Sequence, residues 1–287
     1  MIQSTPKKVF IQANKSQRIG ALLGKYSIER ASPGIQVEIL QVEEIPAFQS
    51  FNGKTYKHGN EERTYNLADE QSFTLTRFMP PQRMEYQGRA IVIDPDVFAV
   101  QDITPLFDLD LDETTVACCR RHEGDFWDTS VMLLENSRLD WVIEEILAKL
   151  SAKEINYNAA IRRVLNAEVL EIPRLWNSLD HKDEETRMIH YTRQRTQPWK
   201  TGLPFTVTPR KLGKILGIIP REWIMGSKKY PNTYQPHKNR AAEQFFFALL
   251  SDALDSKAID TQVIEEEIEY KRVRPDILER MRQLTTT

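Results

Sequence analysis

The residues from Ile91 to Phe98, which read Ile-Val-Ile-Asp-Pro-Asp-Val-Phe, constrain the fold more than any other part of the chain. Three branched apolar residues in a row predict a strand that is buried on both faces, as in a parallel sheet. Pro95 ends the strand, because proline lacks the backbone N–H that a sheet ladder needs. Asp94 and Asp96 are thereby placed at the carboxyl edge of a sheet, where open α/β sheets bind ligands.

The two carboxylates predict a metal site. Side chains held this close repel one another unless a cation lies between them. Their hard oxygen atoms suit Mg²⁺ or Mn²⁺, which in turn can hold a diphosphate. The Asp-x-Asp pattern alone is common in solvated turns, and the acidic run of Asp108, Asp110 and Asp112 has no strand before it. The preceding strand is therefore what favours the metal site.

A second polar patch follows the predicted strand Met188–Ile189 and reads His190-Tyr-Thr-Arg-Gln-Arg-Thr-Gln-Pro-Trp199. A histidine at the end of a strand brings an imidazole to a metal at the sheet edge, and imidazole suits Mn²⁺ better than Mg²⁺. Arg193 and Arg195 supply bidentate donors for phosphate oxygens. A lone histidine is more often structural, so His190 is a candidate metal ligand only because the chain also offers Asp94 and Asp96.

Two further stretches supply polar groups next to predicted elements. Asp128, Thr129 and Ser130 stand at the start of a predicted buried strand, where short polar side chains suit sugar hydroxyls; a plain turn is the alternative. Arg77 precedes Asp94 by seventeen positions and, taken alone, reads as an ordinary surface arginine.

Composition excludes some classes of partner. With 39 basic and 41 acidic residues among 287, the net charge is −2, which gives no reason to expect nucleic acid or a membrane surface as the main partner. The amino terminus lacks the apolar core of a signal peptide, and no apolar run approaches the roughly 18 residues of a membrane span. The only cysteines, Cys118 and Cys119, point to opposite faces of a predicted strand, so we expect free thiols and a cytoplasmic location.

The apolar pattern predicts an α/β domain followed by a helical part. Val9–Ala13, Arg18–Ala31 and Val37–Leu40 predict a strand, a helix and a strand, which imply a parallel sheet with a right-handed crossover. Further predicted elements are helices at 73–79, 139–150 and 157–165, strands at 116–120 and 130–134, and a loop at 52–66. A loop at 226–238 leads into a helix at 240–254. We therefore divide the chain into a domain of residues 1–205 and a helical carboxy-terminal appendage of residues 206–287.

In this order and spacing, the motifs resemble those of the retaining glycosyltransferases of the glycogenin type, to which lipopolysaccharide galactosyltransferases also belong. The matching stretches are Phe10–Ile28, Phe73–Pro80, Gly88–Phe107, Asp128–Asn136, Leu175–Leu179 and His190–Trp199. The resemblance implies the GT-A fold, a mixed and mostly parallel sheet flanked by helices. It also implies metal-dependent transfer of a sugar from a UDP-sugar to a sugar, lipid or protein acceptor, with retention of configuration.

The resemblance further implies roles for individual residues. Ala13 and Asn14 would hold the uracil and ribose, and Arg77 would contact the donor sugar or its diphosphate. The implied ligands of Mn²⁺ or Mg²⁺ are Asp94, Asp96 and His190. The residues implied to bind the donor are Ala13, Asn14, Arg77, Asp94, Ser130, Arg193 and Arg195. The residues implied to take part in catalysis are Asp128 and Asn158.

The chain departs from the family pattern at three places. Gln197 stands where the family has a lysine before Pro-Trp, and Arg193 or Arg195 lies within one loop of it. Val131 stands where a glycine is usual, and the family's Asp-Gln pair has no clear match beyond the segment around Asn158. These departures leave open a non-catalytic module that binds a nucleotide-sugar. A nucleotidyltransferase is less favoured, because residues 14–17 lack the glycines that such an enzyme carries after its first strand.

Overall fold

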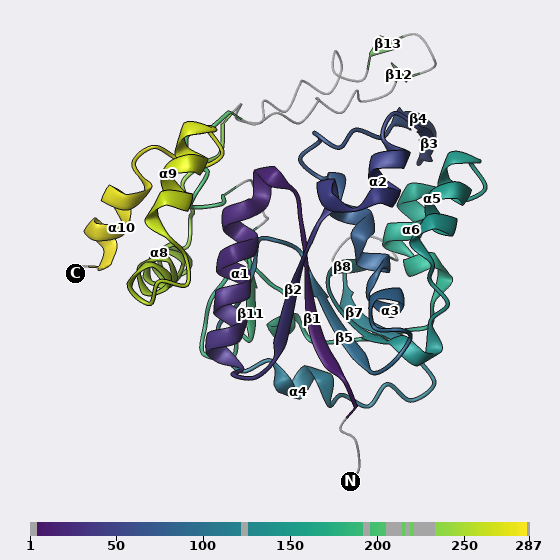
Figure 1. Ribbon diagram of the computed structural model, residues 1–287, viewed down its shortest axis with the longest axis horizontal. Helices are drawn as coiled ribbons and strands as arrows, with labels where there is room; N and C mark the ends of the chain where they lie inside the picture. The colour runs from purple at the N-terminus through teal and green to yellow at the C-terminus, as the bar shows by residue number, and fades with distance from the viewer. Residues whose placement is uncertain are drawn as a thin grey trace.

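The computed structural model describes residues 5–121, 126–191, 196–204 and 233–285, together with two short strands, β12 (Lys214–Ile215) and β13 (Ile219–Pro220). A six-stranded sheet lies at its centre (Figure 1), with the strand order β2-β1-β5-β8-β7-β9. The strands of this sheet are β1 (Lys7–Ala13), β2 (Gln36–Gln41), β5 (Arg89–Ile93), β7 (Val116–Arg120), β8 (Trp127–Glu135) and β9 (Val169–Glu171).

The sheet is mixed. Strand β1 pairs in parallel with β2 and β5, and β7 pairs in parallel with β9, whereas β8 runs antiparallel to both β5 and β7. Side chains alternate between its two faces, as the pleat requires: Phe10 and Val92 enter one core cluster, and Ile11 and Ile93 enter the other. With helices on both faces and at the carboxyl end, this architecture confirms the predicted fold class.

Helices cover the two faces of the sheet unequally (Figure 1). One face carries the long helix α1 (Arg18–Ala31), whose bounds agree with the prediction, and the short α4 (Thr104–Phe107). The other face carries α2 (Pro46–Phe51), α3 (Pro80–Arg83), α5 (Ile143–Ser151) and α6 (Tyr157–Arg162). Short 3-10 helices join these elements: η1 (Lys15–Gln17), η2 (Val42–Glu44), η3 (Ser72–Phe78), η4 (Asn136–Arg138), η5 (Val164–Asn166) and η6 (Arg174–Trp176).

A second, three-stranded sheet brings a distant segment to the end of β5. It consists of β10 (Ser178–Leu179), β11 (Met188–His190) and β6 (Val97–Ala99). Strand β11 is antiparallel to β6, and His190 lies opposite Val97. The imidazole is therefore carried to the residues that immediately precede β6.

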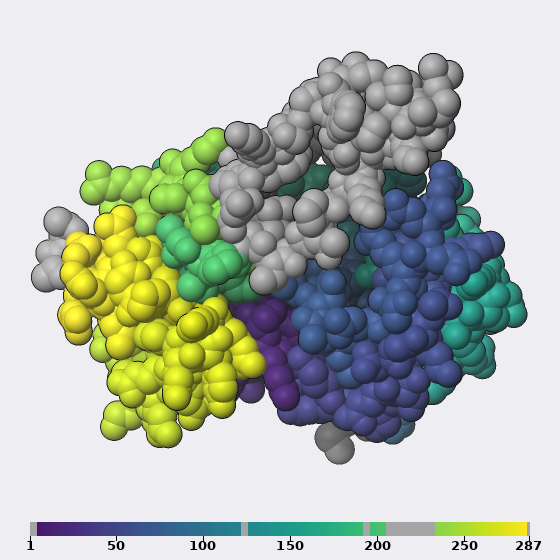
Figure 2. All heavy atoms as spheres, turned by 90° about the horizontal axis from the view of Figure 1, so that it is seen from above, coloured from purple at the N-terminus to yellow at the C-terminus, as the bar shows by residue number. Residues whose placement is uncertain are grey.

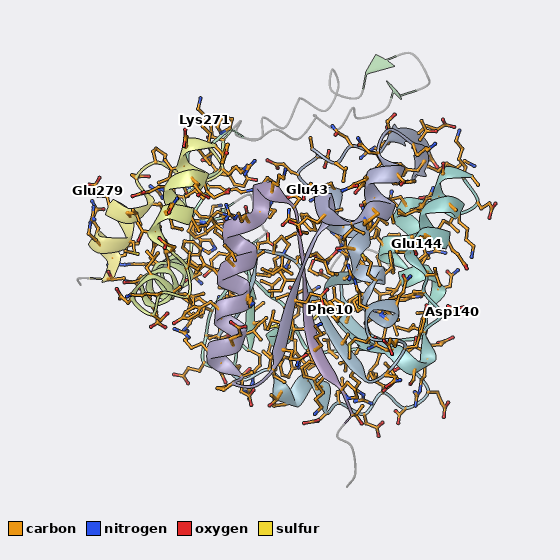
Figure 3. The ribbon with its side chains drawn as sticks, in the orientation of Figure 1. Phe10, Glu43, Asp140, Glu144, Lys271 and Glu279 are labelled. Atoms are coloured by element: carbon orange, nitrogen blue, oxygen red, sulfur yellow. The ribbon has the colours of Figure 1, made fainter. Side chains whose placement is uncertain are left out.

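The carboxy-terminal helices α8 (Arg240–Asp255), α9 (Thr261–Glu269) and α10 (Ile277–Thr285) lie beside α1 (Figures 1 and 2). They share a hydrophobic core with α1 and β6, in which the ring of Trp199 stacks on Phe246 at 5.0 Å. Figure 3 places Lys271 and Glu279 on the outer side of these helices and Phe10 at the central sheet. The boundary after residue 205 stays a prediction.

Several boundaries differ from the prediction. Residues 52–66 are not a plain loop, because β3 (Thr55–His58) and β4 (Glu61–Thr64) form a hairpin whose turn uses Gly59 at a φ of 66°. Strand β8 begins at Trp127, so Asp128, Thr129 and Ser130 lie within it.

Cys118 and Cys119 are free and lie on opposite faces of the sheet, as predicted. Within the described ranges, no helix is long and apolar enough to cross a membrane.

Candidate metal centre

The turn after β5 presents its two carboxylates on either side of Pro95. The backbone N–H of Asp94 donates to the carbonyl of Ser130 at 2.9 Å, and that of Val97 donates to the carbonyl of Asp94 at 3.2 Å. Helix α1 packs against the turn, and Gly20 makes this close approach possible. A Cβ at Gly20 would overlap the carbonyl oxygen of Pro95 and lie 3.2 Å from the ring of Trp199. The glycine therefore fixes how closely the helix packs against the turn.

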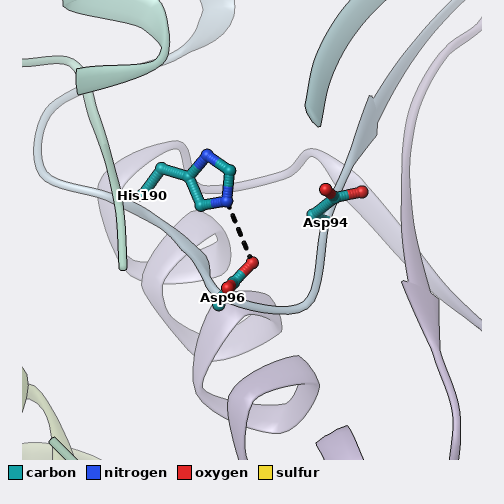
Figure 4. A group of neighbouring side chains, drawn as sticks. All are labelled: Asp94, Asp96 and His190. Atoms are coloured by element: carbon teal, nitrogen blue, oxygen red, sulfur yellow. Dashed lines mark ion pairs between the residues drawn. The ribbon is translucent and has the colours of Figure 1, made fainter. Parts of the chain in front are cut away.

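His190 completes a group of three metal-binding side chains. Ligand atoms of Asp94, Asp96 and His190 all lie within 4.8 Å of one another. The Nε2 of His190 lies 3.2 Å from Oδ1 of Asp96, which is the ion pair drawn in Figure 4, and Asp94 lies on the other side of the same space. Two carboxylates and one imidazole form a donor set that suits Mn²⁺. The sequence-predicted metal ligands are thus brought together.

Buried donors from other elements hold the two carboxylates in place. Gln12, on β1, donates its Nε2 to Oδ1 of Asp94 at 2.7 Å, and Arg77 donates Nη2 to the same oxygen at 3.1 Å. Gln197 donates its Nε2 to Oδ2 of Asp96 at 2.8 Å. All three donors are at least nine-tenths buried, so they restrict both carboxylates to narrow orientations.

The protonation states of the group respond to one another. Burial raises the pKa of Asp94 to about 6, although the charge of Arg77 opposes the change. Burial alone would lower the pKa of His190, but the charge of Asp96 and the hydrogen bond to it outweigh burial and raise the pKa to about 9. Without a metal, His190 therefore carries a proton that pairs with Asp96 at neutral pH. A bound cation would take the place of that proton.

The side chains around the ligands fit a bound metal with its water or substrate ligands. Three of them keep one buried amide atom without a hydrogen-bond partner among the described residues: Oε1 of Gln12, Oε1 of Gln197 and Nδ2 of Asn177. Buried polar groups are usually paired, so unpaired atoms gathered at one place indicate partners that the protein itself does not supply. The donor set and these atoms agree in favouring a metal centre.

Asp128 and Ser130 lie next to this centre, at an irregularity in strand pairing. The register between β7 and β8 shifts after Cys118, so that residues 129–131 bulge between paired positions. The hydroxyl of Ser130 lies near both carboxylates and acts to lower the pKa of Asp94 and of Asp128. Arg174 donates Nη1 to Oδ2 of Asp128 at 2.7 Å. Burial opposes ionisation of Asp128, but His190 and Arg174 outweigh it and hold the pKa below its usual value.

The residues predicted to hold the nucleoside lie at the end of β1. Ala13 is fully buried, and Asn14 is 2% exposed. The amide of Asn14 donates to the backbone carbonyls of Asp69 at 3.0 Å and Glu70 at 3.1 Å. Asn14 therefore fixes the loop at residues 69–72 over the end of the strand.

Arg77 and Asn158 have protein partners of their own. Beyond Asp94, the guanidinium of Arg77 donates to the carbonyl of Thr74 at 2.7 Å and to Thr129. Asn158 lies beside the hairpin turn, where its Nδ2 is 3.1 Å from the position of a Cβ on Gly59. Tyr157 stacks on His58, and Thr74 and Arg77 are near enough to its hydroxyl to act on its pKa. Arg193 and Arg195 lie outside the described residues.

Sequence reasoning missed four residues near the centre: Gln12, Asn177, Arg174 and Lys200. Gln12 carries a recognisable signal, because it is the polar residue within the apolar stretch from Val9 to Ala13. Asn177 accepts a hydrogen bond from Nδ1 of His190 and lies in a stretch that the resemblance had matched without giving it a role. Arg174 and Lys200 look like surface cations in the sequence, and only the fold shows where they lie.

Neither a protein-family profile nor a curated protein matches the chain. Several glycosyltransferases of known structure are similar to it. An active-site mutant of the galactosyltransferase LgtC is 15% identical, over 67% of this chain and 89% of its own, with a TM-score of 0.48. GlyE of Streptococcus pneumoniae is 18% identical, over 82% of this chain and 66% of its own, with a TM-score of 0.48. Mouse xyloside xylosyltransferase 1 is 12% identical, over 65% of this chain and 98% of its own, with a TM-score of 0.43.

Identities and TM-scores at this level carry no argument about activity. Function is therefore inferred from the side chains at the ends of β5 and β11.

Proposed function

We propose that this protein is a metal-dependent glycosyltransferase that moves a sugar from a UDP-sugar to an acceptor. The observation that carries the proposal is the group of Asp94, Asp96 and His190, with ligand atoms within 4.8 Å of one another at the carboxyl end of β5. Ligands bind at this edge in open α/β folds. The donor set favours Mn²⁺ over Mg²⁺, because one ligand is an imidazole.

The chemistry of sugar transfer makes use of these groups. Cleavage of the anomeric bond leaves negative charge on the departing diphosphate, and a Mn²⁺ held by the three ligands would stabilise that charge. Asp128 stays ionised beside the same centre because Arg174 and His190 hold its pKa down. A fixed carboxylate stabilises the positive charge that develops on the anomeric carbon. Retention of configuration is an expectation that comes from the family resemblance.

A non-catalytic module that binds a nucleotide-sugar is the second candidate. One observation favours it: Asn158 lies beside Gly59 and Asn156, and no described contact joins it to the carboxylates. The alternative would retain the metal and UDP sites but release no UDP. We place either activity in the cytoplasm, which the free thiols of Cys118 and Cys119 support.

The test is release of free UDP from a panel of UDP-sugars, with Mn²⁺ and with EDTA. We expect metal-dependent release from one sugar by the wild-type protein and none by Asp96→Ala. Asp96→Ala should also lose metal-dependent UDP binding while it keeps its fold, because Asp96 lies in a turn rather than in the core clusters.

Two outcomes distinguish the candidates. Metal-dependent UDP binding by the wild type, without release from any sugar or with any tested acceptor, would favour the binding module. Unchanged UDP binding by Asp96→Ala would overturn the metal assignment on which both candidates depend.

A further inference from the structure

Lys200 is a buried cation close to the metal centre. The backbone N–H of Lys200 donates to the carbonyl of Gln197 at 3.0 Å and closes a turn after Gln197. Lys200 is only 3% exposed. Burial lowers its pKa to about 8, and the nearby charges of Glu70, Asp96 and Glu267 act in the opposite direction. At neutral pH the ammonium is therefore still charged, in a place where a charge is costly to bury.

No carboxylate among the described residues pairs with this ammonium within ion-pair distance. Each of the three carboxylates that act on it has another partner. Asp96 is held by His190 and Gln197, and Glu267 pairs with Arg18 and Arg272 at 3.3 Å each. Glu70 accepts from the hydroxyl of Tyr234 at 3.4 Å. The contact of Nζ is instead with the ring of Tyr234, 5.4 Å from its centroid. Within the described part of the chain, the ammonium thus has an aromatic partner and no carboxylate at ion-pair distance.

The position of Lys200 indicates which anion it would meet. Glu70 belongs to the loop that Asn14 fixes over the end of β1. Asp96 belongs to the metal centre, and Gln197 ties the Lys200 turn to it directly. The ammonium faces the ring of Tyr234, whose hydroxyl reaches Glu70, and the backbone of Lys200 is tied through Gln197 to Asp96. Lys200 is therefore linked to both the proposed nucleoside end and the proposed metal end. A nucleoside diphosphate bound between these ends has its phosphates in that interval.

We propose that Lys200 is a binding residue for the diphosphate of the donor, and that it supplies the positive charge which Gln197 does not. This inference rests on the proposed function. An ammonium acts as a point charge on phosphate oxygens, and the aromatic ring of Tyr234 holds it in place without neutralising it. A bound diphosphate would give this ammonium an anion at close range, which the described residues do not supply.

The test compares the binding of UDP and of uridine, both with Mn²⁺, by calorimetric titration of the full chain. Lys200→Met removes the charge and keeps the length of the side chain. We expect UDP to bind at least about tenfold more weakly to this variant, while uridine affinity stays the same, because uridine has no phosphate. In the absence of ligand, Lys200→Met should melt at the same temperature as the wild type or higher, because an unpaired buried charge has been removed.

A matched control is Lys182→Met, which removes another cation that faces an aromatic ring, 5.8 Å from the centroid of Phe245. Its UDP affinity should equal that of the wild type. Equal loss of UDP and uridine affinity in Lys200→Met, together with a lower melting temperature, would mean that Lys200 is structural. An unchanged UDP affinity in Lys200→Met would also overturn the inference about Lys200. The proposed function would still hold in that case, provided that the wild-type protein binds UDP. A wild-type protein that binds no UDP would overturn both.

Discussion

The Nδ1 atom of His190 lies 2.9 Å from the amide oxygen of Asn177. The oxygen can only accept, so Nδ1 carries the hydrogen, and Nε2 is the ring atom left for a metal. In the metal-free protein, Nε2 is protonated and pairs with Asp96 at 3.2 Å. Asn177 therefore sets both the orientation of the ring and the atom that it offers.

Removal of this contact should weaken the metal site without removing a ligand. We expect Asn177→Ala to lower Mn²⁺ affinity by about 10- to 100-fold, the usual loss when a group that orients a metal ligand is deleted. Free Mn²⁺, followed by electron paramagnetic resonance, measures the affinity. Asn177→Asp keeps an oxygen acceptor and should lose less. Equal Mn²⁺ affinity in the wild type and Asn177→Ala would contradict this role.

His190 should matter more for Mn²⁺ than for Mg²⁺. Imidazole contributes strongly to Mn²⁺ binding, whereas Mg²⁺ relies on oxygen ligands and retained water. We therefore expect His190→Ala to lower Mn²⁺ affinity by a larger factor than Mg²⁺ affinity. UDP binding by the wild type and by His190→Ala is measured as a function of Mn²⁺ and of Mg²⁺ concentration. The two titrations give the factor by which the affinity for each ion falls. Equal factors would indicate that His190 is structural.

The raised pKa of His190 predicts how the stability of the metal-free protein depends on pH. Its pKa is about 9 in the folded protein and has an ordinary value of 6.5. The folded state thus holds the proton of His190 more tightly than the unfolded state does. The stability that this proton contributes is fully present below pH 6.5 and is lost as the pH rises through about 9. We expect the melting temperature of metal-free protein to fall over this range, and Mn²⁺ to reverse the fall.

The measurement is the difference in melting temperature between the wild type and His190→Ala at each pH. This difference is needed because Lys200, with its pKa lowered to about 8, adds stability as the pH rises above that value. The interval from pH 6.5 to 8 is therefore the clearest. A difference that stays constant across it would show that His190 gains no proton on folding.

The sequence predicts the elements that carry the site better than it predicts the site's surroundings. Helix α1 has the expected bounds, and the turn at Asp94 and Asp96 follows a buried strand as expected. These features depend on local patterns: apolar periodicity for the helix, and branched residues followed by proline for the strand. His190 was recognisable because it follows a predicted strand, and the family resemblance then implied its role as a metal ligand.

The partners of these ligands depend on tertiary contacts that no local pattern encodes. Gln12 reaches Asp94 from 82 positions away, and Gln197 reaches Asp96 from 101 positions away. The hairpin of β3 and β4 was missed because its strands are mostly exposed and polar, with only Tyr56 buried. Propensity is weak in such strands, and the packing of Tyr56 against Tyr157 decides the structure.

Arg193 and Arg195 remain predictions, since both lie outside the described residues. If either assists the diphosphate, Arg193→Ala or Arg195→Ala should weaken UDP binding by about tenfold, with uridine affinity unchanged. Combination with Lys200→Met then measures whether the cations act on the same phosphates, because shared partners make the losses non-additive. Unchanged UDP affinity in both arginine variants would exclude them as substitutes for the lysine that Gln197 replaces.

Gly20 should be intolerant of even a methyl group, although it lies within a helix. A glycine-to-alanine change in a helix normally stabilises by up to about 1 kcal/mol. At Gly20 the added carbon would overlap the carbonyl oxygen of Pro95 and press on Trp199, so helix α1 or the turn must move. We expect Gly20→Ala to destabilise the protein by about 1–3 kcal/mol, the usual cost of overpacking, and to lower Mn²⁺ affinity as well.

Denaturant unfolding of the metal-free protein and a Mn²⁺ titration measure the two effects of Gly20→Ala. Gly24→Ala, one turn further along α1, is the control, because its added carbon would lie 3.3 Å from the carbonyl oxygen of Val97, a milder contact than the overlap at Gly20 and one that does not press on Pro95 between the two carboxylates. Its Mn²⁺ affinity should be that of the wild type. A stable Gly20→Ala variant with normal Mn²⁺ affinity would show that the Asp94–Asp96 turn does not depend on its contact with helix α1.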